Sequence, residues 1–180
     1  NDYEKALKGF QYVTERPVSQ FSEPALLGGA TILYAQKKYD EALVNYQKLE
    51  EVATFATNKL EAQIGVMRCA YKIGNYELAL LATEKVLDDE NTPEKIAREA
   101  ILTEGKIRLT NKEYELAKAD FAILVKQHNS VEGAESKYRL AEITFIQDSL
   151  DASEAHIFEL VEDFSAFTFW KVKSFILLSD

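Results

Sequence analysis

The most constraining feature of this sequence is a short phrase, an aromatic residue followed three positions later by a small one, that recurs at a nearly fixed interval. Clear copies occur at Tyr3/Ala6, Tyr39/Ala42, Tyr76/Ala79 and Tyr114/Ala117, with a blurred copy at Leu150/Ser153. Successive copies begin 36, 37, 38 and 36 residues apart. A period in the range of roughly 20–50 residues is typical of arrays built from one repeated supersecondary unit. The period therefore decides the architecture before any other feature does.

The residues that follow each copy of the phrase predict a helix. Apolar side chains recur three and four positions apart, as at Tyr39, Ala42, Tyr46 and Leu49, which places them on one stripe of an α-helix. Helix breakers are scarce, because the chain has only 7 Gly and 3 Pro. We expect each of these second helices to follow a first helix, and the first helices to lie near residues 23–36, 58–73, 94–110, 132–147 and 167–180.

Start and stop signals support these helices. Ser22 and Thr92 each stand just before a glutamate and a proline, and Asn129 or Ser130 can cap a later helix. The break inside a repeat is short, as at Gly74-Asn75. Such short connections force consecutive helices to pack antiparallel.

The sequence thus predicts an all-α fold, a right-handed superhelical α-solenoid of antiparallel helix pairs. We expect one array over residues 1–180, with about four pairs between a leading second helix and a trailing first helix. Its parts are 2–13, the pairs 22–54, 58–88, 93–127 and 131–163, and 167–180. Ala42, Ala79 and Ala117 are expected at the helix crossings, facing small residues of the preceding helix such as Ala30, Gly65, Gly105 and Ala141.

Charge and composition exclude several classes of function. The formal net charge is −9 and no basic cluster is present, which disfavours binding to nucleic acid. No apolar run approaches the roughly 18–20 residues of a membrane span, so we expect no membrane insertion of this segment. No signal peptide opens the sequence. Because the chain begins and stops inside a repeat, both ends are expected to be cuts in a longer protein.

The reactive side chains do not form a catalytic or metal-binding pattern. Cys69 has no histidine at helical spacing, and His128 and His156 lie on different helices, so structural roles are favoured for all three. The acidic run Asp88-Asp89-Glu90 lacks the alternate ligands and the glycine of a calcium loop. Gly28-Gly29 lacks the Lys-Ser/Thr of a phosphate loop and indicates close helix packing. We expect no enzyme activity, no cofactor and no metal.

With these repeated helix pairs, the chain resembles the tetratricopeptide repeat family. The matching residues are the second-helix signatures Tyr39/Ala42/Tyr46, Tyr76/Ala79 and Tyr114/Ala117/Phe121, and the small first-helix residues Ala30, Gly105 and Ala141. The period is longer than the family's usual 34, and Met67 stands where a small residue is usual. The resemblance implies paired antiparallel helices and a role in binding other proteins.

Two local phrases, at residues 62–71 and 134–142, resemble repeat proteins of the Gram-negative bacterial envelope. These include relatives of the periplasmic Tol-Pal coordinator and outer-membrane assembly lipoproteins, which are common in Bacteroides-like bacteria. The resemblance implies a periplasmic or outer-membrane-associated location, with the cytoplasm as the alternative.

The resemblance also implies a binding surface on the concave face, formed by the first helices. Mapped onto this chain, its residues are Leu27, Thr31, Tyr34, Ile64, Arg68, Tyr71, Lys106, Leu109, Tyr138 and Glu142. The lysine, asparagine and arginine set that clamps chaperone tails in some members is incomplete here. We therefore expect a non-catalytic scaffold that binds a protein or peptide segment in a groove. The alternative is a structural module that self-assembles through the end helices 2–13 and 167–180.

Overall fold

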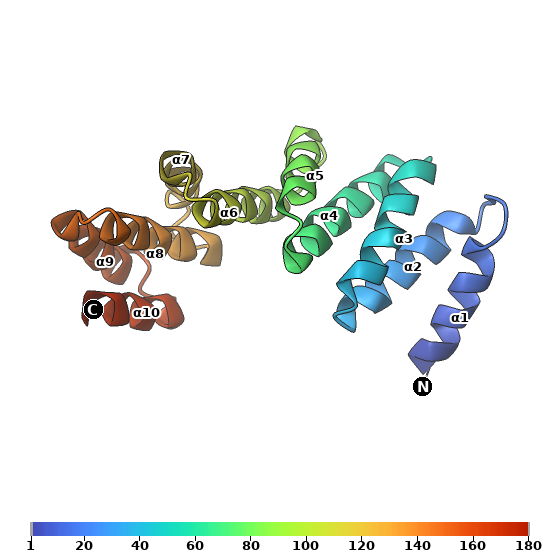
Figure 1. The fold of residues 1–180 in the computed structure, drawn as a ribbon, viewed down its shortest axis with the longest axis horizontal. Coiled ribbons are helices and arrows are strands. Elements are labelled where there is room, and N and C mark those ends of the chain that lie inside the picture. Colours follow the sequence, from blue (N-terminus) through green and yellow to red (C-terminus); the bar gives the residue numbers. More distant parts are fainter. Residues whose placement is uncertain (1, 180) are drawn as a thin grey trace. The chain divides into compact units, whose positions relative to one another are not determined.

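The computed structural model of the protein describes residues 2–179, and these form ten α-helices with no strand among them. The all-α class is confirmed, and the helices pack against their sequence neighbours in the manner of a helix-pair solenoid (Figure 1). The helices are α1 (Asp2–Thr14), α2 (Ser22–Ala35), α3 (Tyr39–Val52), α4 (Ala56–Ile73), α5 (Tyr76–Asp88), α6 (Glu94–Thr110), α7 (Tyr114–Leu124), α8 (Val131–Ile146), α9 (Leu150–Asp163) and α10 (Thr168–Ser179).

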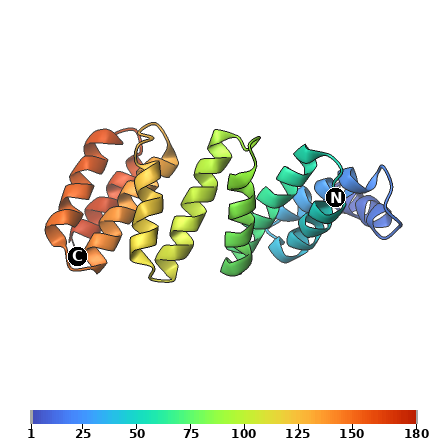
Figure 2. The same cartoon turned by 90° about the horizontal axis from the view of Figure 1, so that it is seen from above.

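Contacts within the chain group it into two compact units, Asn1–Ile96 and Ala97–Asp180. In the first unit each helix from α1 to α4 packs on the next, and α2 also touches α4. In the second unit α7, α8, α9 and α10 pack in succession, and α8 also touches α10. Figure 2 shows consecutive helices of each unit side by side. The contacts that skip a helix join first helices of successive repeats, which is how stacked pairs bury a continuous core.

The helix starts agree with the sequence-based expectation to within two residues, but two of the expected caps are wrong. Ser130 caps α8, since its hydroxyl accepts a hydrogen bond from the Gly133 N–H at 3.0 Å. Ser22 is instead the first residue of α2, and its hydroxyl accepts from the Ser19 N–H. The Thr92 hydroxyl donates back to the Val86 carbonyl at 2.5 Å, at the end of α5, and does not cap α6.

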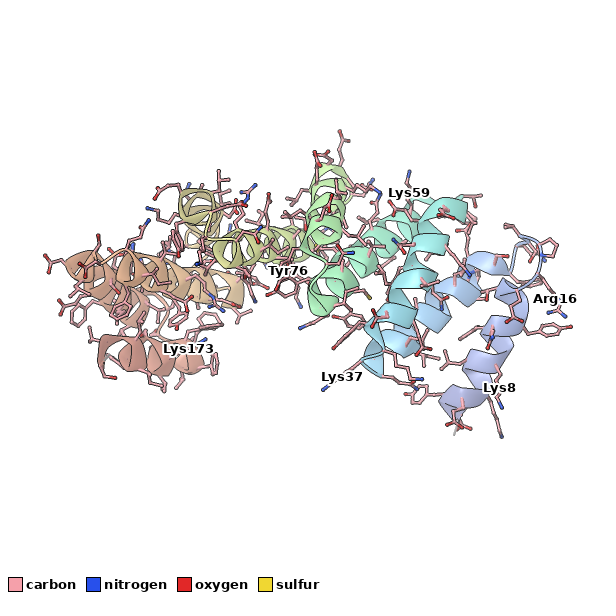
Figure 3. The ribbon with its side chains drawn as sticks, viewed as in Figure 1. Lys8, Arg16, Lys37, Lys59, Tyr76 and Lys173 are labelled. Carbon is pink, nitrogen blue, oxygen red and sulfur yellow. The ribbon has the colours of Figure 1, made fainter. Side chains whose placement is uncertain are left out.

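The turn from first to second helix has the same backbone geometry in all four complete pairs. Its central residue has a positive φ each time, at Lys37 (60°), Gly74 (80°), Lys112 (63°) and Asp148 (59°). The following N–H donates to a carbonyl five residues back, as from Lys38 to Leu33 at 2.9 Å. This is the Schellman ending of a helix, and three of the four copies form it without glycine. Lys37 marks the α2–α3 copy in Figure 3.

After its opening residue, the stripe predicted on the second helices is buried in all four pairs. The buried residues are Ala42, Tyr46 and Leu49; Ala79, Thr83 and Val86; Ala117, Phe121 and Leu124; Ser153, Ile157 and Leu160, none more than 8% exposed. The opening residue is half-buried at Tyr39, Tyr76 and Tyr114 and 57% exposed at Leu150. The stripe therefore provides the core of each pair, as the periodicity predicts.

One place in the repeat, which we name the crossing position, is buried in all four first helices: Ala30, Met67, Gly105 and Ala141. At Gly105, an added Cβ would lie 2.7 Å from the Phe121 ring of α7. At Ala141, the carbonyl accepts a hydrogen bond from the Ser153 hydroxyl of α9 at 2.9 Å. The two helices therefore approach closely at Gly105 and Ala141, whereas the crossing position of α4 holds the larger, fully buried Met67.

Gly65 has a different role from the one expected. It lies under Tyr46 of α3, where an added Cβ would be 2.4 Å from ring atoms Cγ and Cδ1. Gly28 lies under Phe10 of α1 in the same way, one repeat earlier. The expectation that Gly65 faces an alanine of the second helix is therefore wrong, because an aromatic ring of the preceding repeat fills that space.

Replacing Lys112 with glycine should stabilise the protein by about 0.5–1 kcal/mol. A left-handed backbone costs an L-residue roughly 1–2 kcal/mol, and the greater chain entropy of glycine when unfolded offsets only part of that gain. Lys112→Ala is the control, since alanine keeps the Cβ and should not stabilise. Urea denaturation measures both, and equal stability of the two variants would contradict this account of the turn.

Gly65→Ala should destabilise the protein by about 1–3 kcal/mol, because the buried Tyr46 ring cannot move aside without disturbing its neighbours. Gly9→Ala in α1 is the matched control, since nothing lies within 4 Å of the added methyl group. There alanine should stabilise by about 0.5–1 kcal/mol through helix propensity. Denaturation curves showing the same sign for both variants would refute the close approach at Gly65.

Candidate functional site

Three predicted site residues, Leu27, Ile64 and Tyr138, stand at the same place in their repeats and pack between stacked repeats. Leu27 lies against the cluster of buried residues that joins α2, α3 and α4. Tyr138 is 5% exposed, and its ring centre lies 5.5 Å from that of Trp170 on α10. Ile64 is also buried but lines a pocket described below. These side chains stack one repeat on the next.

Three more, Tyr34, Tyr71 and Leu109, lie in the last turn of a first helix, just before the Schellman turn. The Tyr34 ring meets that of Tyr39 edge to face, with centres 5.2 Å apart. The Tyr71 ring lies 6.2 Å from that of Tyr76, which Figure 3 labels at the start of α5. Leu109 packs against the core cluster around Phe121 in the corresponding place. This position joins the two helices of a pair at their turn.

The remaining four predicted site residues occupy a third common place in their repeats, and this place is the most accessible of the three. They are Thr31, Arg68, Lys106 and Glu142. Thr31 is exposed; its hydroxyl donates to the Leu27 carbonyl at 2.8 Å and hydrogen-bonds with the Tyr46 hydroxyl. Burial raises the pKa of Tyr46, so its hydroxyl stays neutral beside the half-buried Arg68. Thr31 and Arg68 are thus linked through Tyr46 on one face of α2 and α4.

In the second unit the predicted charges lie in a chain of ion pairs. Lys106 Nζ lies 3.0 Å from Glu135 Oε1, and Arg139 contacts Glu135 at 3.3 Å and Glu142 at 2.7 Å. Burial lowers the pKa of Arg139, but the two carboxylates outweigh it and the net shift is upward. Lys106 and Glu142 therefore pair with neighbouring side chains across α6 and α8, which reduces the charge that they offer to a ligand.

A second ionic centre joins α6 to α7 beneath the surface. Arg108 Nη1 lies 2.6 Å from Asp120 Oδ1, and the same guanidinium also contacts Glu104. Burial raises the pKa of Asp120 to about 6, although Arg108 acts in the opposite direction. Asp120 therefore titrates closer to neutrality than an exposed aspartate does.

A pocket of about 400 Å³ opens beside α4 in the first unit. Its lining comprises Ala56, Thr57, Leu60, Glu61, Ile64, Arg68, Asn91, Pro93 and Ile96. Ile64 and Arg68, both predicted site residues, stand on its α4 wall. Sequence reasoning missed the opposite wall, Asn91, Pro93 and Ile96, because Asn91 and Pro93 lie in the connection before α6, which has no periodic pattern, and Ile96 lies in the first turn of α6. The lining is mostly apolar, with Arg68 and Glu61 as its charged groups.

The reactive side chains have structural surroundings. Cys69 is fully buried, and burial raises the pKa of its thiol to about 12. The His128 ring packs 5.3 Å from the Phe164 ring, and His156 Nδ1 lies 3.8 Å from Glu159. Burial, with Lys137 nearby, lowers the pKa of His156. Among residues 2–179, no group of three or more His, Cys, Asp or Glu side chains is placed to hold a metal ion.

No helix within residues 2–179 combines the length and the apolar character needed to cross a membrane. Comparison with protein-family models and with curated proteins finds no match in either case.

Stability should fall as the pH rises from 4 to 7 because of Asp120. Its pKa is higher in the folded than in the unfolded chain, so the folded state binds more protons in this interval. Relative to Asp120→Asn, the protein should lose roughly 1–3 kcal/mol between these pH values. Urea denaturation of both proteins at pH 4, 5, 6 and 7 measures this difference. Parallel pH profiles would show that Asp120 is not shifted upward.

Proposed function

We propose that this chain is a non-catalytic interaction scaffold that binds a segment of a protein partner along its first helices. The pocket beside α4 carries the proposal, because it combines a mostly apolar lining with a basic group on a preformed helix surface. Such pockets suit an apolar side chain held next to a polar anchor. Ile64 and Ile96 would contact the apolar side chain, and Arg68 would hydrogen-bond to a carbonyl or carboxylate beside it.

The recurring turn between the helices of a pair supports this role. Turns with the same positive φ occur at Lys37, Gly74, Lys112 and Asp148, and each sets how the two helices of its own pair meet. Binding to a preformed surface costs less conformational entropy, because the receptor does not have to become ordered when the partner binds. No reacting group belongs to the proposal, since the thiol of Cys69 is buried and held protonated.

The array is proposed to be of the tetratricopeptide type. Support comes from the Tyr-x-x-Ala openings of α3, α5 and α7, and from the buried small residues Ala30 and Ala141 at the crossing position. The resemblance of residues 62–71 and 134–142 to envelope proteins supports a periplasmic or outer-membrane-associated location, with the cytoplasm as the alternative.

Peptides selected on this chain from a random display library should bind at the α4 pocket. Arg68→Glu reverses the charge at the pocket and should weaken their binding at least tenfold, about 1.4 kcal/mol. Lys72→Glu is the matched control, because it makes the same charge change one turn further along α4, outside the pocket lining. Calorimetric titration measures both affinities.

Circular dichroism should show equal helix content in the two variants. If the selected peptides bind Arg68→Glu as tightly as the unchanged chain, the pocket is not their site. If no peptide is enriched at all, the groove is not a general receptor for extended segments.

A further inference from the structure

We propose that the partner segment bound in the α4 pocket carries a lysine or arginine beside its apolar side chain, and that carboxylates at one end of the pocket hold this basic group. The preference rests on the proposed binding of a partner segment in the same pocket, and it names the chemistry of that segment. Three features of the first unit support it: the place of Glu61, the acidic run that follows α5, and the scarcity of cations around them.

Glu61 gives the pocket a negative charge at the end nearer the start of α4. Its side chain is exposed, and it stands between the apolar lining residues Leu60 and Ile64. Arg68, the other charged residue of the lining, follows two helical turns later, about 10.5 Å along the axis. That separation is about the Debye length at 0.1 M salt, so the two charges act on different parts of a bound segment.

The acidic run Asp88-Asp89-Glu90 lies at the same end of the pocket as Glu61. The helices α4 and α5 pack on each other and are joined by the short turn at Gly74-Asn75, so they run antiparallel. Asp88 comes 13 residues after Asn75, and Glu61 comes 13 residues before Gly74, so the two are level along the pair. The run leads directly into Asn91, which lines the pocket itself.

Hydrogen bonds fix the connection that carries the acidic run. The Asp89 carboxylate accepts from the Asn91 N–H at 2.9 Å and from the Asn91 side-chain amide at 3.0 Å. Asp88 and Glu90 are exposed on either side of Asp89. Within residues 2–179, Glu61, Asp88 and Glu90 form no ion pair, so their charges remain open to a partner.

Few cations offset these carboxylates. Between residues 88 and 96 the chain has one basic residue, Lys95, against four acidic ones: Asp88, Asp89, Glu90 and Glu94. On α4, Lys59 lines a different pocket, together with Glu51. This end of the α4 pocket is therefore acidic, and the net charge of −9 adds to its attraction for a basic segment.

One short segment can satisfy both ends of the pocket. Its apolar side chain would lie against Ile64 and Ile96, and the neighbouring lysine or arginine would place its charged head beside Glu61 while its aliphatic stem covers apolar surface. Three residues of extended chain span about 10 Å, which lets a main-chain carbonyl of the same segment reach Arg68.

Peptides selected on the unchanged chain test this preference. Those that lose affinity for Arg68→Glu bind in the pocket, and they should carry a lysine or arginine within two residues of their apolar side chain. Replacing that basic residue with glutamine should weaken binding to the unchanged chain about fivefold, as expected for a basic group near two exposed carboxylates. Calorimetric titration in 50 mM NaCl measures these affinities.

Glu61→Gln with Glu90→Gln removes two carboxylates from the acidic end of the pocket. It should weaken binding of the basic peptide about fivefold, and it should make the peptide's lysine-to-glutamine change almost without effect, because the interacting charges are already gone. Glu77→Gln with Glu84→Gln is the matched control, since it removes two exposed carboxylates of α5 that are outside the pocket lining. The control should bind the peptide as the unchanged chain does.

The outcomes separate this preference from the groove binding on which it rests. Pocket-bound peptides without a basic residue would overturn the preference and leave the groove binding intact. An affinity unchanged in Glu61→Gln with Glu90→Gln would do the same, and an equal loss in the control would assign the attraction to overall charge and not to the pocket. Peptides that bind Arg68→Glu as tightly as the unchanged chain would overturn both.

Discussion

The structure depends on second helices that are covered from two sides. The stripes of α3 and α9 are buried where the first helix of the same pair and the first helix of the next repeat both pack on them. Tyr46 shows both contacts, since it reaches Thr31 of its own pair and lies over Gly65 of the next. A helix pair alone would leave that ring half in water, so stability resides in the stacking of neighbours.

Most of the fold could be predicted from the sequence because it depends on periodic local signals. The openings of the second helices at Tyr39, Tyr76, Tyr114 and Leu150 follow directly from the repeated phrase. The partner of a particular small residue could not be predicted in this way. Whether Gly65 faces Ala79 or Tyr46 depends on how far α4 rotates about its axis, which is decided by packing of all the neighbouring side chains.

The candidate site was less predictable for two physical reasons. A first helix has one face for its pair and one for the neighbouring repeat, so Tyr138, assigned to the groove, is instead covered by Trp170. Long charged side chains also form ion pairs between helices. Lys106 of α6 pairs with Glu135 of α8, and because these residues are far apart in the sequence, no local pattern predicts the pair. Arg68 and Ile64 were found because they lie within a periodic first helix, whereas Pro93 lies in a connection without a pattern and Ile96 in the first turn of α6.

The uniform Schellman turns have a consequence for how this chain could change during evolution. Because Lys37 and Gly74 have the same backbone geometry, the 37 residues from Lys38 to Gly74 form a segment whose two ends are interchangeable. Recombination between such points would duplicate or remove a whole unit while keeping the direction in which the chain leaves the helix. The array can therefore lengthen or shorten by whole repeats, and only the side chains at the new junction would have to adapt.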